Sequence, residues 1–214
     1  MDFLFTKLYP ILDSSYIPQT DRAEYLHRLG SSLSDAGVTL LEYRNKQGSD
    51  EELVADASIL RKALPTGMIK LILDDRADLV ECTGFDGVHV DAGDTSPADA
   101  RALLGPEAII GTFGGGEALL PGILSAPASY LSIGPVFPTR TKQTANRPIG
   151  IDGVKRLRDQ AGLEPVLVGV AGITLETAAA VIEAGASLVA VSEAIFGAAD
   201  PAAEVRRWMA ALSC

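Results

Sequence analysis

The sequence predicts an α/β protein that folds as a single (β/α)8 (TIM) barrel, with residues 1–214 forming one domain. Eight short, β-rich apolar runs alternate with segments whose apolar residues recur every three or four positions, the spacing of an amphipathic helix. A weak internal repeat points the same way. The stretches AGVTLLEYR, TGFDGVHV, APASYLSIG and AGASLVAV each place a small residue and a turn ahead of a candidate strand. They fall at every second strand, as expected of a closed barrel of eight.

The candidate strands follow one another at regular intervals. They are LYPILD (8–13), TLLEYR (39–44), KLILD (70–74), DGVHV (86–90), AIIGT (108–112), YLSIG (130–134), PVLVGV (165–170) and SLVAV (187–191). Helical spacing is found in segments 22–37, 153–162 and 174–186, and Gly162 is a predicted helix stop. Several strands are continuously apolar, as in a parallel sheet that helices cover. An open, doubly wound sheet is the structural alternative, which is weakened because no GxGxxG motif opens a helix after the first strand.

Composition limits the classes of function. The chain is 47% hydrophobic and 21% charged, which supplies enough apolar material for a full core. Its formal net charge is −10, so non-specific binding to nucleic acid is disfavoured. Cys82 and Cys214 do not make a disulfide framework or a zinc site, and are expected to be free thiols in a cytoplasmic protein. The stretch MDFLFTKLYPILD has no signal-peptide pattern, and no apolar run reaches the ~18 residues of a membrane span.

Polar residues follow the predicted strands at the end where barrel enzymes carry their active sites. In chain order they are Glu42, Tyr43, Arg44, Asn45 and Lys46; Asp74, Asp75 and Arg76; Asp91 and Asp94; Thr112, Phe113 and the glycines 114–116; the loop 134–150; GVAGIT (169–174); and Ser192 with Glu193. A closed barrel brings all of these strand ends around one mouth. We therefore expect the side chains to converge on a site.

Structural explanations are open for several of these residues when each is taken singly. Asp75 is a candidate helix cap, and Arg44 and Lys46 are candidate surface charges. His89 lies within a strand, where a buried core histidine is commoner than a catalyst, and His27 is expected on the exposed face of a helix. The convergence of the strand ends favours the functional interpretation.

The residue types indicate two sites for phosphorylated groups. Asp75 and Asp94 offer hard oxygen ligands of the kind that Mg²⁺ takes together with water and phosphate. Arg44, Lys46 and Lys142 are cations suited to a polyphosphate. AGIT after the seventh strand and VSEA after the eighth are typical of a barrel phosphate site, in which glycine allows close backbone approach and helix N-termini present N–H groups.

Five ordered motifs resemble those of thiamine phosphate synthases (thiamine-phosphate pyrophosphorylases), and the resemblance covers nearly the whole chain. GPVFPTRTK (134–142) is similar to the family's GPxxPTxTK loop after the sixth strand. LEYRNK resembles the family's QLRxK segment, LDDRADL its NDR segment, GVHVDAGD its GxHxGQxD segment and VGVAGIT its GGIT segment.

The resemblance implies an enzyme that joins hydroxymethylpyrimidine diphosphate to thiazole phosphate and releases pyrophosphate. It implies Mg²⁺ held by Asp75 and Asp94. The pyrimidine diphosphate would be held by Glu42, Tyr43, Arg44, Asn45, Lys46, Asp74 and Lys142, and the thiazole phosphate by Thr139, Arg140, Thr141, Gly172, Ser192 and Glu193. Lys142, Arg44 and Lys46 are the expected catalytic cations, because a dissociative reaction needs charge neutralisation on the leaving group. The expected partners are small molecules rather than nucleic acid or membrane, and a homo-oligomer stays open.

Four positions depart from the family pattern, all on the side of the pyrimidine. Glu42 stands in place of glutamine, Asp74 in place of asparagine and Phe113 in place of serine, while the glycines 114–116 replace a polar stretch. Two carboxylates there would repel an anion unless they are protonated or paired, so another aromatic diphosphate is an alternative substrate. A thiazole tautomerase-like paralogue is a weaker alternative, because TFGGGE lacks the histidine that those enzymes use. A non-catalytic barrel that binds a phosphorylated ligand is the non-enzymatic alternative.

Overall fold

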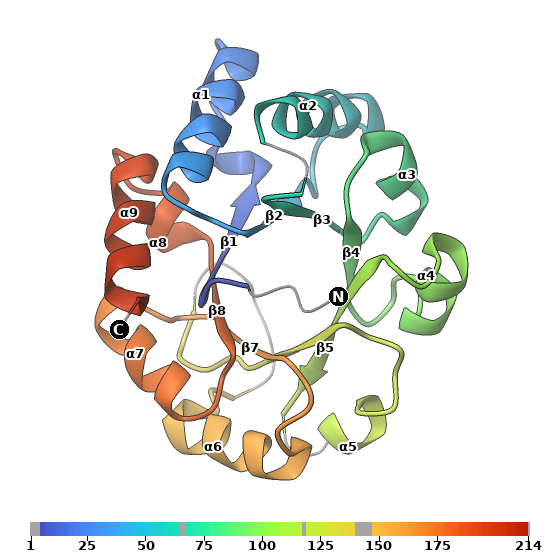
Figure 1. Ribbon diagram of the computed structural model, residues 1–214, viewed down its shortest axis with the longest axis vertical. Helices are drawn as coiled ribbons and strands as arrows, with labels where there is room; N and C mark the ends of the chain where they lie inside the picture. The colour runs from blue at the N-terminus through green and yellow to red at the C-terminus, as the bar shows by residue number, and fades with distance from the viewer. Residues whose placement is uncertain (1–4, 65–66, 117–118, 140–146, 214) are drawn as a thin grey trace.

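Eight parallel strands close into a barrel in simple chain order, with β8 paired to β1 (Figure 1). This computed structural model describes residues 5–64, 67–116, 119–139 and 147–213. The strands are β1 (Leu8–Asp13), β2 (Leu40–Arg44), β3 (Lys70–Asp74), β4 (Gly87–Val90), β5 (Ile109–Gly115), β6 (Tyr130–Ile133), β7 (Leu167–Val170) and β8 (Leu188–Val191). The predicted barrel is confirmed. β1 and β3 have the predicted bounds, whereas β5 continues through two of the glycines that were expected in a loop.

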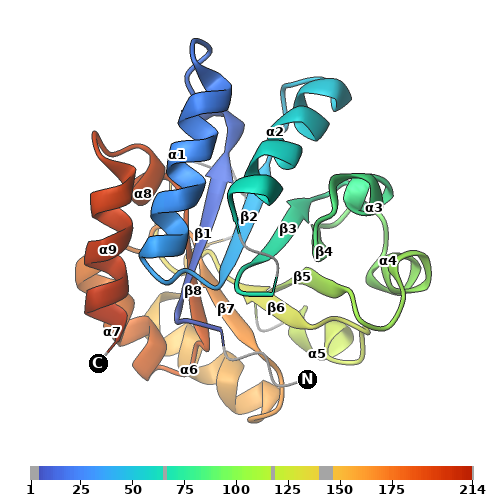
Figure 2. The ribbon, with the colours of Figure 1, turned by 45° about the horizontal axis from the view of Figure 1, so that its top comes forward.

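Helices cover the outside of the barrel, as Figure 2 shows. The longer ones are α1 (Arg22–Asp35), α2 (Asp50–Ala63), α4 (Pro97–Leu104), α6 (Gly150–Ala161), α7 (Leu175–Glu183) and α9 (Pro201–Leu212). Single turns are formed by η1 (Ser14–Tyr16), η2 (Ala77–Leu79), α3 (Val80–Thr83), α5 (Leu120–Ile123) and α8 (Glu193–Phe196). Gly162 ends α6 with φ 75°, as its position predicted. α9 was not among the predicted helices, and it buries Trp208 against the barrel's outer layer.

The alternation of side chains along each strand divides the core into two layers. Tyr9, Leu40 and Ile72 belong to a small cluster inside the barrel, together with Tyr130, Val168, Leu188 and Ala190. Their sequence neighbours Leu8 and Leu41 face outward and join the much larger cluster between sheet and helices. Because successive residues on a strand face opposite sides, this alternation also decides which polar residues near the strand ends can reach the barrel mouth.

The internal repeat noticed in the sequence has a physical basis at the face of the barrel where the strands begin. Thr39, Asp86, Ser129 and Ser187 each immediately precede an even-numbered strand. We call these four residues the strand-start caps. Their side-chain oxygens accept backbone N–H groups of the preceding segment, those of Thr6, Leu71, Ile110 and Leu167, at 2.9, 2.9, 3.1 and 3.3 Å. Each cap therefore joins an odd strand to the even strand that follows it.

Three arginines contact three of these caps. Each arginine lies on the helix that follows the preceding even-numbered strand. Arg61 of α2 contacts Asp86 at 2.9 Å, Arg101 of α4 contacts Ser129 at 3.3 Å, and Arg158 of α6 contacts Ser187 at 3.2 Å. The same guanidinium groups also donate to backbone carbonyls of the nearby loops, as Arg158 does to Gly185 at 2.8 Å. The caps connect strands within a pair, and the arginines connect successive pairs.

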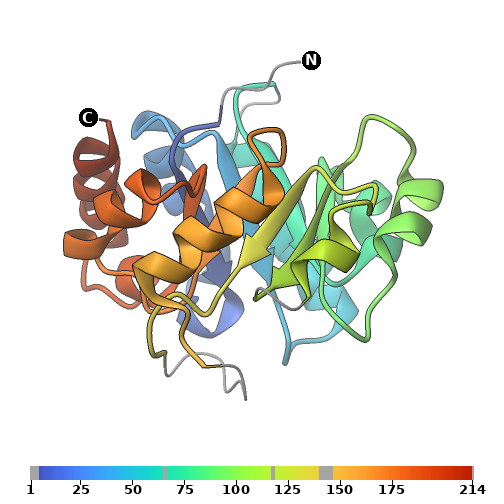
Figure 3. The ribbon, with the colours of Figure 1, turned by 90° about the horizontal axis from the view of Figure 1, so that it is seen from below.

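In the part of the chain that the structure describes, no helix has both the length and the apolar character needed to cross a lipid bilayer. The helices run antiparallel to the strands they cover, so that the start of β1 and the end of α9 lie at the same end of the barrel (Figure 3).

Candidate active site

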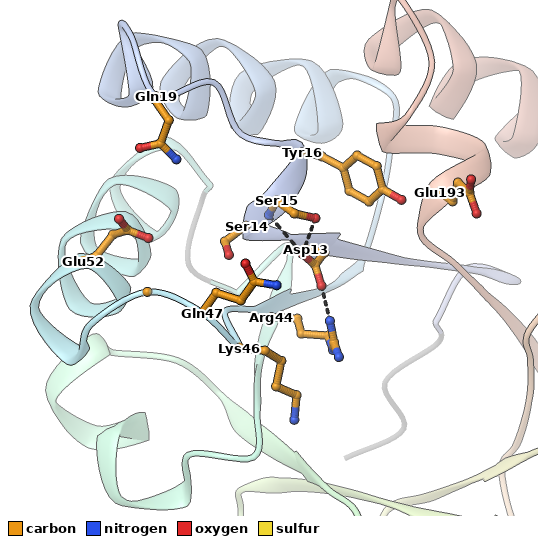
Figure 4. A pocket seen from close by; sticks show the side chains of 11 residues that line it. Asp13, Ser14, Ser15, Tyr16, Gln19, Arg44, Lys46, Gln47, Glu52 and Glu193 are labelled. Atoms are coloured by element: carbon orange, nitrogen blue, oxygen red, sulfur yellow. Dashed lines mark hydrogen bonds and ion pairs between the residues drawn. The ribbon is translucent and has the colours of Figure 1, made fainter. Parts of the chain in front are cut away.

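A cavity of about 620 Å³ opens at the carboxyl ends of the strands. Every strand contributes a lining residue: Tyr9, Glu42, Asp74, His89, Phe113, Ser132, Val170 and Ala190. A second cavity of about 600 Å³ adjoins it above β1 and β2, where Ser14, Ser15, Tyr16 and Gln47 line it (Figure 4). Both cavities share Asp13, Arg44, Lys46 and Glu193, so these four residues lie at the junction of one continuous mouth.

The structure brings most of the predicted site residues together. Glu42, Arg44, Lys46, Asp74, Phe113, Thr139, Gly172, Ser192 and Glu193 all line the larger cavity. Tyr43, Asn45, Asp75 and Asp94 do not line it, and each is described below. Arg140, Thr141 and Lys142 lie outside the described residues.

Two cations and three carboxylates form an alternating cluster at the junction of the cavities. Arg44 pairs with Asp13, as Figure 4 shows, and its Nε lies 3.4 Å from Asp74 Oδ2. Lys46 Nζ lies 3.1 Å from the same Asp74 oxygen and also pairs with Asp75. The carboxylates thus hold both cations at the mouth without a bound anion. An anion that enters the mouth can therefore pair with Arg44 and Lys46 in place of these carboxylates, and the two cations are already in position.

Asp13, at the end of β1, was missed by the sequence analysis, although it follows a buried strand in the same way as Asp74. Burial raises the pKa of Asp13, but hydrogen bonds from Ser15 and Arg44 outweigh burial and hold this pKa below its ordinary value. Asp13 is therefore a stable anion that fixes the position of the Arg44 guanidinium. The sequence signal was an aspartate that ends an otherwise apolar strand.

Asp75 occupies a left-handed backbone conformation, with φ 65°, directly after β3. Its N–H donates to the carbonyl of His89 at 2.8 Å, which ties the end of β3 to β4. The helical turn η2 begins with Arg76 as its N-cap and has no side-chain cap, so the structure gives Asp75 no role as a helix cap. One of its carboxylate oxygens, Oδ1, is buried without a hydrogen-bonding partner among the described residues.

Asp94 lies in the exposed loop after β4. Its Oδ2 accepts the N–H of Asp91 at 2.9 Å, and its own N–H donates to the carbonyl of Asp91 at 3.2 Å, which closes a tight turn. Among the described residues, no three acidic, histidine or cysteine side chains gather as a ready-made metal site. The predicted arrangement of two aspartates and a substrate phosphate needs fewer protein ligands than that, and it stays a prediction.

Tyr43 and Asn45 differ from the expectation that they contact substrate. Tyr43 alternates with Glu42 and Arg44 on β2, so its side chain faces the helices, where its hydroxyl donates to Asp56 of α2. Asn45 uses its amide within the loop: Oδ1 accepts Gly48 N–H at 2.7 Å and the Ser14 hydroxyl at 3.0 Å. Both residues therefore position the loop that carries Arg44 and Lys46. A strict application of strand alternation would have placed Tyr43 correctly.

A chain of hydrogen bonds crosses the floor of the larger cavity. The Tyr9 hydroxyl lies 2.7 Å from Glu42 Oε2 and 2.7 Å from the Tyr130 hydroxyl, which lies 3.0 Å from His89 Nδ1. His89 is buried, as expected, but it lines the cavity rather than the outer core, and its Nε2 lies 3.6 Å from Asp91 Oδ1. Tyr9 and Tyr130 were not singled out from the sequence; the signal was a phenol at the start of an otherwise apolar strand.

The loop after β6 packs against the segment after β7. Val136 N–H donates to Val170 O at 2.8 Å, and Phe137 N–H donates to Ala171 O at 3.1 Å. Gly172 has φ 67°, and a Cβ there would lie 2.5 Å from the Pro138 carbonyl oxygen. Beside them, Ser192 Oγ is buried with no hydrogen-bonding partner among the described residues. This end of the cavity therefore combines close backbone packing with an unsatisfied hydroxyl.

Replacing Gly172 with alanine is expected to destabilise the protein by about 1–3 kcal/mol, because the methyl group would strain the left-handed backbone and displace the loop at Pro138. Denaturant unfolding measures this loss. Gly162→Ala is the matched control, since Gly162 has φ 75° but no atom within 4 Å of the added Cβ. Equal losses in the two variants would show that the contact with the loop has no energetic effect.

The chain resembles proteins of known activity along most of its length. A family model described as thiamine monophosphate synthase matches residues 8–195. A thiamine-phosphate synthase of Koribacter versatilis is 41% identical over 186 residues, covering 86% of each protein. A thiamine-phosphate synthase of Agrobacterium fabrum is 39% identical over 179 residues, covering 82% of this chain and 81% of the relative.

Solved structures agree with the sequence relatives. A thiamine phosphate pyrophosphorylase from Pyrococcus furiosus superposes with a TM-score of 0.82 at 25% identity, covering 97% of this chain and 95% of that one. A 3-hexulose-6-phosphate synthase structure, at 17% identity and a TM-score of 0.67, shares the fold. The family match, the sequence identities and the shared barrel together establish that this chain belongs to the thiamine monophosphate synthase family.

Proposed function

We propose that this protein is a Mg²⁺-dependent transferase that joins hydroxymethylpyrimidine diphosphate to thiazole phosphate, releases pyrophosphate and forms thiamine phosphate. The observation that carries the proposal is the cluster of Arg44 and Lys46 with Asp13, Asp74 and Asp75 at the barrel mouth. It places preorganised cations beside a cavity of about 620 Å³, in a chain that belongs to a family of this activity.

In this proposal Arg44 and Lys46 exchange part of their pairing with the carboxylates for pairing with the diphosphate. Negative charge accumulates on the leaving pyrophosphate as the carbon–oxygen bond breaks, so cations already fixed at the mouth favour the transition state over the ground state. Lys142, outside the described residues, would act on the same group. Tyr43 and Asn45 act indirectly, by fixing the loop between β2 and α2.

The thiazole phosphate is assigned to the side of the cavity formed by the ends of β6, β7 and β8. Thr139 and Ser192 line that side. Ser192 Oγ is buried there without a hydrogen-bonding partner among the described residues, so its hydroxyl is available to donate to a bound anion. Gly172 and Ala171 adopt left-handed backbone conformations between these two lining residues. Arg140 and Thr141 are assigned to the same phosphate by the loop motif. The two substrates would then meet with the thiazole nitrogen facing the pyrimidine carbon.

The residues near Asp75 fit a divalent cation. Asp75 Oδ1 is a hard, buried oxygen with no partner among the described residues, which is the donor type that Mg²⁺ prefers. Asp75 and Asp94 would hold the ion together with the diphosphate. When bound, Mg²⁺ would neutralise charge on the diphosphate. Ligation of Asp75 would also compete with its pairing to Lys46 and make that ammonium group available to substrate.

Asp75→Asn is expected to abolish the Mg²⁺ dependence of diphosphate binding. In the parent protein, chelation of Mg²⁺ should lower the affinity for pyrimidine diphosphate by about tenfold or more, which corresponds to ~1.4 kcal/mol. The variant should bind equally with and without Mg²⁺, because it lacks the ligand and leaves Lys46 less restrained. Calorimetric titration measures both affinities, with Asp78→Asn, at the exposed residue of η2, as the control. A variant that keeps the full Mg²⁺ effect would remove Asp75 from the metal site.

The function is tested by a coupled assay with both substrates and Mg²⁺, following pyrophosphate release and formation of thiamine phosphate. Turnover supports the proposal. Ligand-induced stabilisation without turnover would instead support a binding barrel. Isomerisation of a thiazole phosphate without pyrophosphate release would support the tautomerase alternative, which a phenylalanine at position 113 and glycines after it do not favour.

A further inference from the structure

Glu42 is the most deeply buried carboxylate of the larger cavity. Glu42 is 3% exposed. The neighbouring side chains are buried as well: Tyr9 is 1% exposed, Tyr130 2% and His89 8%. The resemblance to the family places glutamine at this position, so this chain has replaced a neutral amide with an acid. The surroundings of Glu42 decide what that acid presents to a substrate.

The hydrogen-bond chain occupies one oxygen of Glu42. The Tyr9 hydroxyl donates to Glu42 Oε2 at 2.7 Å. The Tyr9 and Tyr130 hydroxyls lie 2.7 Å apart, and the Tyr130 hydroxyl lies 3.0 Å from His89 Nδ1. When Tyr9 donates its single proton to Oε2, it accepts from Tyr130, and Tyr130 accepts from His89 Nδ1. In this arrangement Oε1 is the carboxyl oxygen open to a ligand.

The charges around Glu42 come from four strands. Asp74 of β3 and Asp91 after β4 disfavour its anion, whereas His89 of β4 and the Tyr9 hydroxyl of β1 favour it. Arg44, the nearest cation on β2, is engaged by Asp13 and Asp74, and Lys46 by Asp74 and Asp75. Burial is the largest effect, and the pKa of Glu42 rises from 4.5 to about 7.

We propose that Glu42 recognises the ring of the diphosphate substrate as a neutral carboxylic acid, donating from Oε1 to an unprotonated ring nitrogen. The inference rests on the proposed function, since it requires that a heteroaromatic ring occupies this cavity. An aminopyrimidine supplies such an acceptor nitrogen. Tyr9 and Tyr130 act as positioning residues, because they hold Oε2 as an acceptor and so leave the proton on Oε1.

The ionised form of Glu42 cannot make this contact. A carboxylate would set its lone pairs against the lone pair of the ring nitrogen on the buried floor of the cavity, where an unpaired polar contact is costly. A glutamine side chain has the same shape and carries its N–H donors at every pH. The Glu42→Gln substitution therefore keeps the shape of the side chain and a hydrogen-bond donor, but removes the dependence of that donor on pH.

The first test needs no ligand. A carboxyl whose pKa is raised in the folded state loses stability as pH rises from its unfolded value through its folded value. Unfolding of the parent and Glu42→Gln proteins should show the glutamine variant gaining relative stability between pH 4.5 and 7 and levelling off above pH 7. A constant difference across this range would show that folding does not raise the pKa of Glu42, and would overturn the inference.

The second test measures affinity for hydroxymethylpyrimidine diphosphate at constant Mg²⁺ from pH 5.5 to 8.5. Titration of the diphosphate affects both proteins alike, so the informative quantity is the ratio of their dissociation constants. The parent should weaken relative to Glu42→Gln by roughly tenfold per pH unit above pH 7, because one proton must be taken up on binding. Tyr9→Phe should move this break to higher pH, since it removes a hydrogen bond that favours the Glu42 anion.

The outcomes separate this inference from the proposed function. A ratio that stays flat over the whole range overturns the role of Glu42, even if the parent enzyme turns over normally. The predicted ratio without pyrophosphate release by any variant supports ring recognition and contradicts the transferase. Binding to neither protein at any pH contradicts both. A Tyr9→Phe profile identical to the parent would remove Tyr9 as a positioning residue.

Discussion

Replacing Asp56 with alanine is expected to destabilise the protein by about 3–5 kcal/mol, the scale for breaking a buried ion pair from one side. Asp56 of α2 is 2% exposed, and its carboxylate contacts Arg22 of α1 and Tyr43 of β2. Arg22 Nη2 pairs with it at 2.6 Å, and the Tyr43 hydroxyl donates to it. The hydrogen bond to Asp56 is the largest cause that raises the pKa of Arg22. Without Asp56 the partly buried Arg22 guanidinium keeps Glu52 as a partner at 3.2 Å, while the buried Tyr43 hydroxyl loses the group it donates to.

Denaturant unfolding gives the stability of this variant. Arg28→Ala is the control, because Arg28 and Glu24 form an exposed pair on the same helix α1, and such pairs contribute about 0–1 kcal/mol. The loss should also reach the site, since Asn45 Nδ2 lies 3.3 Å from the Tyr43 hydroxyl and Asn45 organises the loop that carries Arg44 and Lys46. An Asp56→Ala protein within about 1 kcal/mol of the parent would show that the network is readily replaced by water.

Lys46→Ala is expected to lower kcat/KM for pyrophosphate release about 10²- to 10³-fold, or ~2.7–4 kcal/mol, by analogy with the loss of one preorganised donor. Two effects act together. The leaving diphosphate loses a cation, and Asp74 and Asp75 lose the ammonium group that pairs with them. Asp74 would keep its contact with Arg44 Nε at 3.4 Å but lose Lys46, and because its side chain is 6% exposed, its less compensated charge would repel the incoming anion in a site poorly screened by water.

Steady-state kinetics with both substrates measures this effect, and Lys62→Ala, an exposed lysine on α2, is the matched control. Adding Asp74→Asn to Lys46→Ala should recover part of the loss, because it removes a carboxylate that has lost one of its two cationic partners. A single Lys46→Ala variant with parental kcat/KM would place Lys46 outside the reaction, and the cluster at the barrel mouth would then be structural.

The barrel was predictable because its signals are local and repeated. β1 and β3 are bounded by the polar residues that follow them, and Gly162 marks the end of α6 through its left-handed conformation. The extension of β5 to Gly115 was not predictable, since glycines favour loops unless a neighbouring strand pairs with them. α9 was missed although Asp200, Pro201 and an amphipathic pattern mark its start.

The site was predictable in part. Strand ends identified Arg44, Lys46 and Asp74, because the fold alone brings such residues together. Tyr43 and Asn45 were assigned to substrate by resemblance of their segment, while their actual partners, Asp56 of α2 and Ser14 of η1, are brought near them by packing between elements. The chain Tyr9–Tyr130–His89 joins strands β1, β6 and β4 across the barrel, and no local pattern carries that information.

The strand-start caps divide the barrel into four links, each a pair of strands: β1–β2, β3–β4, β5–β6 and β7–β8. The joint between the last link and the first differs from the other three. Each of the first three links is fastened to the next by Arg61, Arg101 or Arg158. Among the described residues no arginine makes the matching contact with Thr39, so β8 and β1 meet through strand pairing and the packing of α9. We expect this joint to depend on the pairing of β8 with β1 and on helix packing, whereas the other three joints also have an arginine contact. Asp13 and Ser192 stand on its two sides, and both line the cavity. The two strands that meet at this joint, β8 and β1, thus both lead to cavity residues where they end.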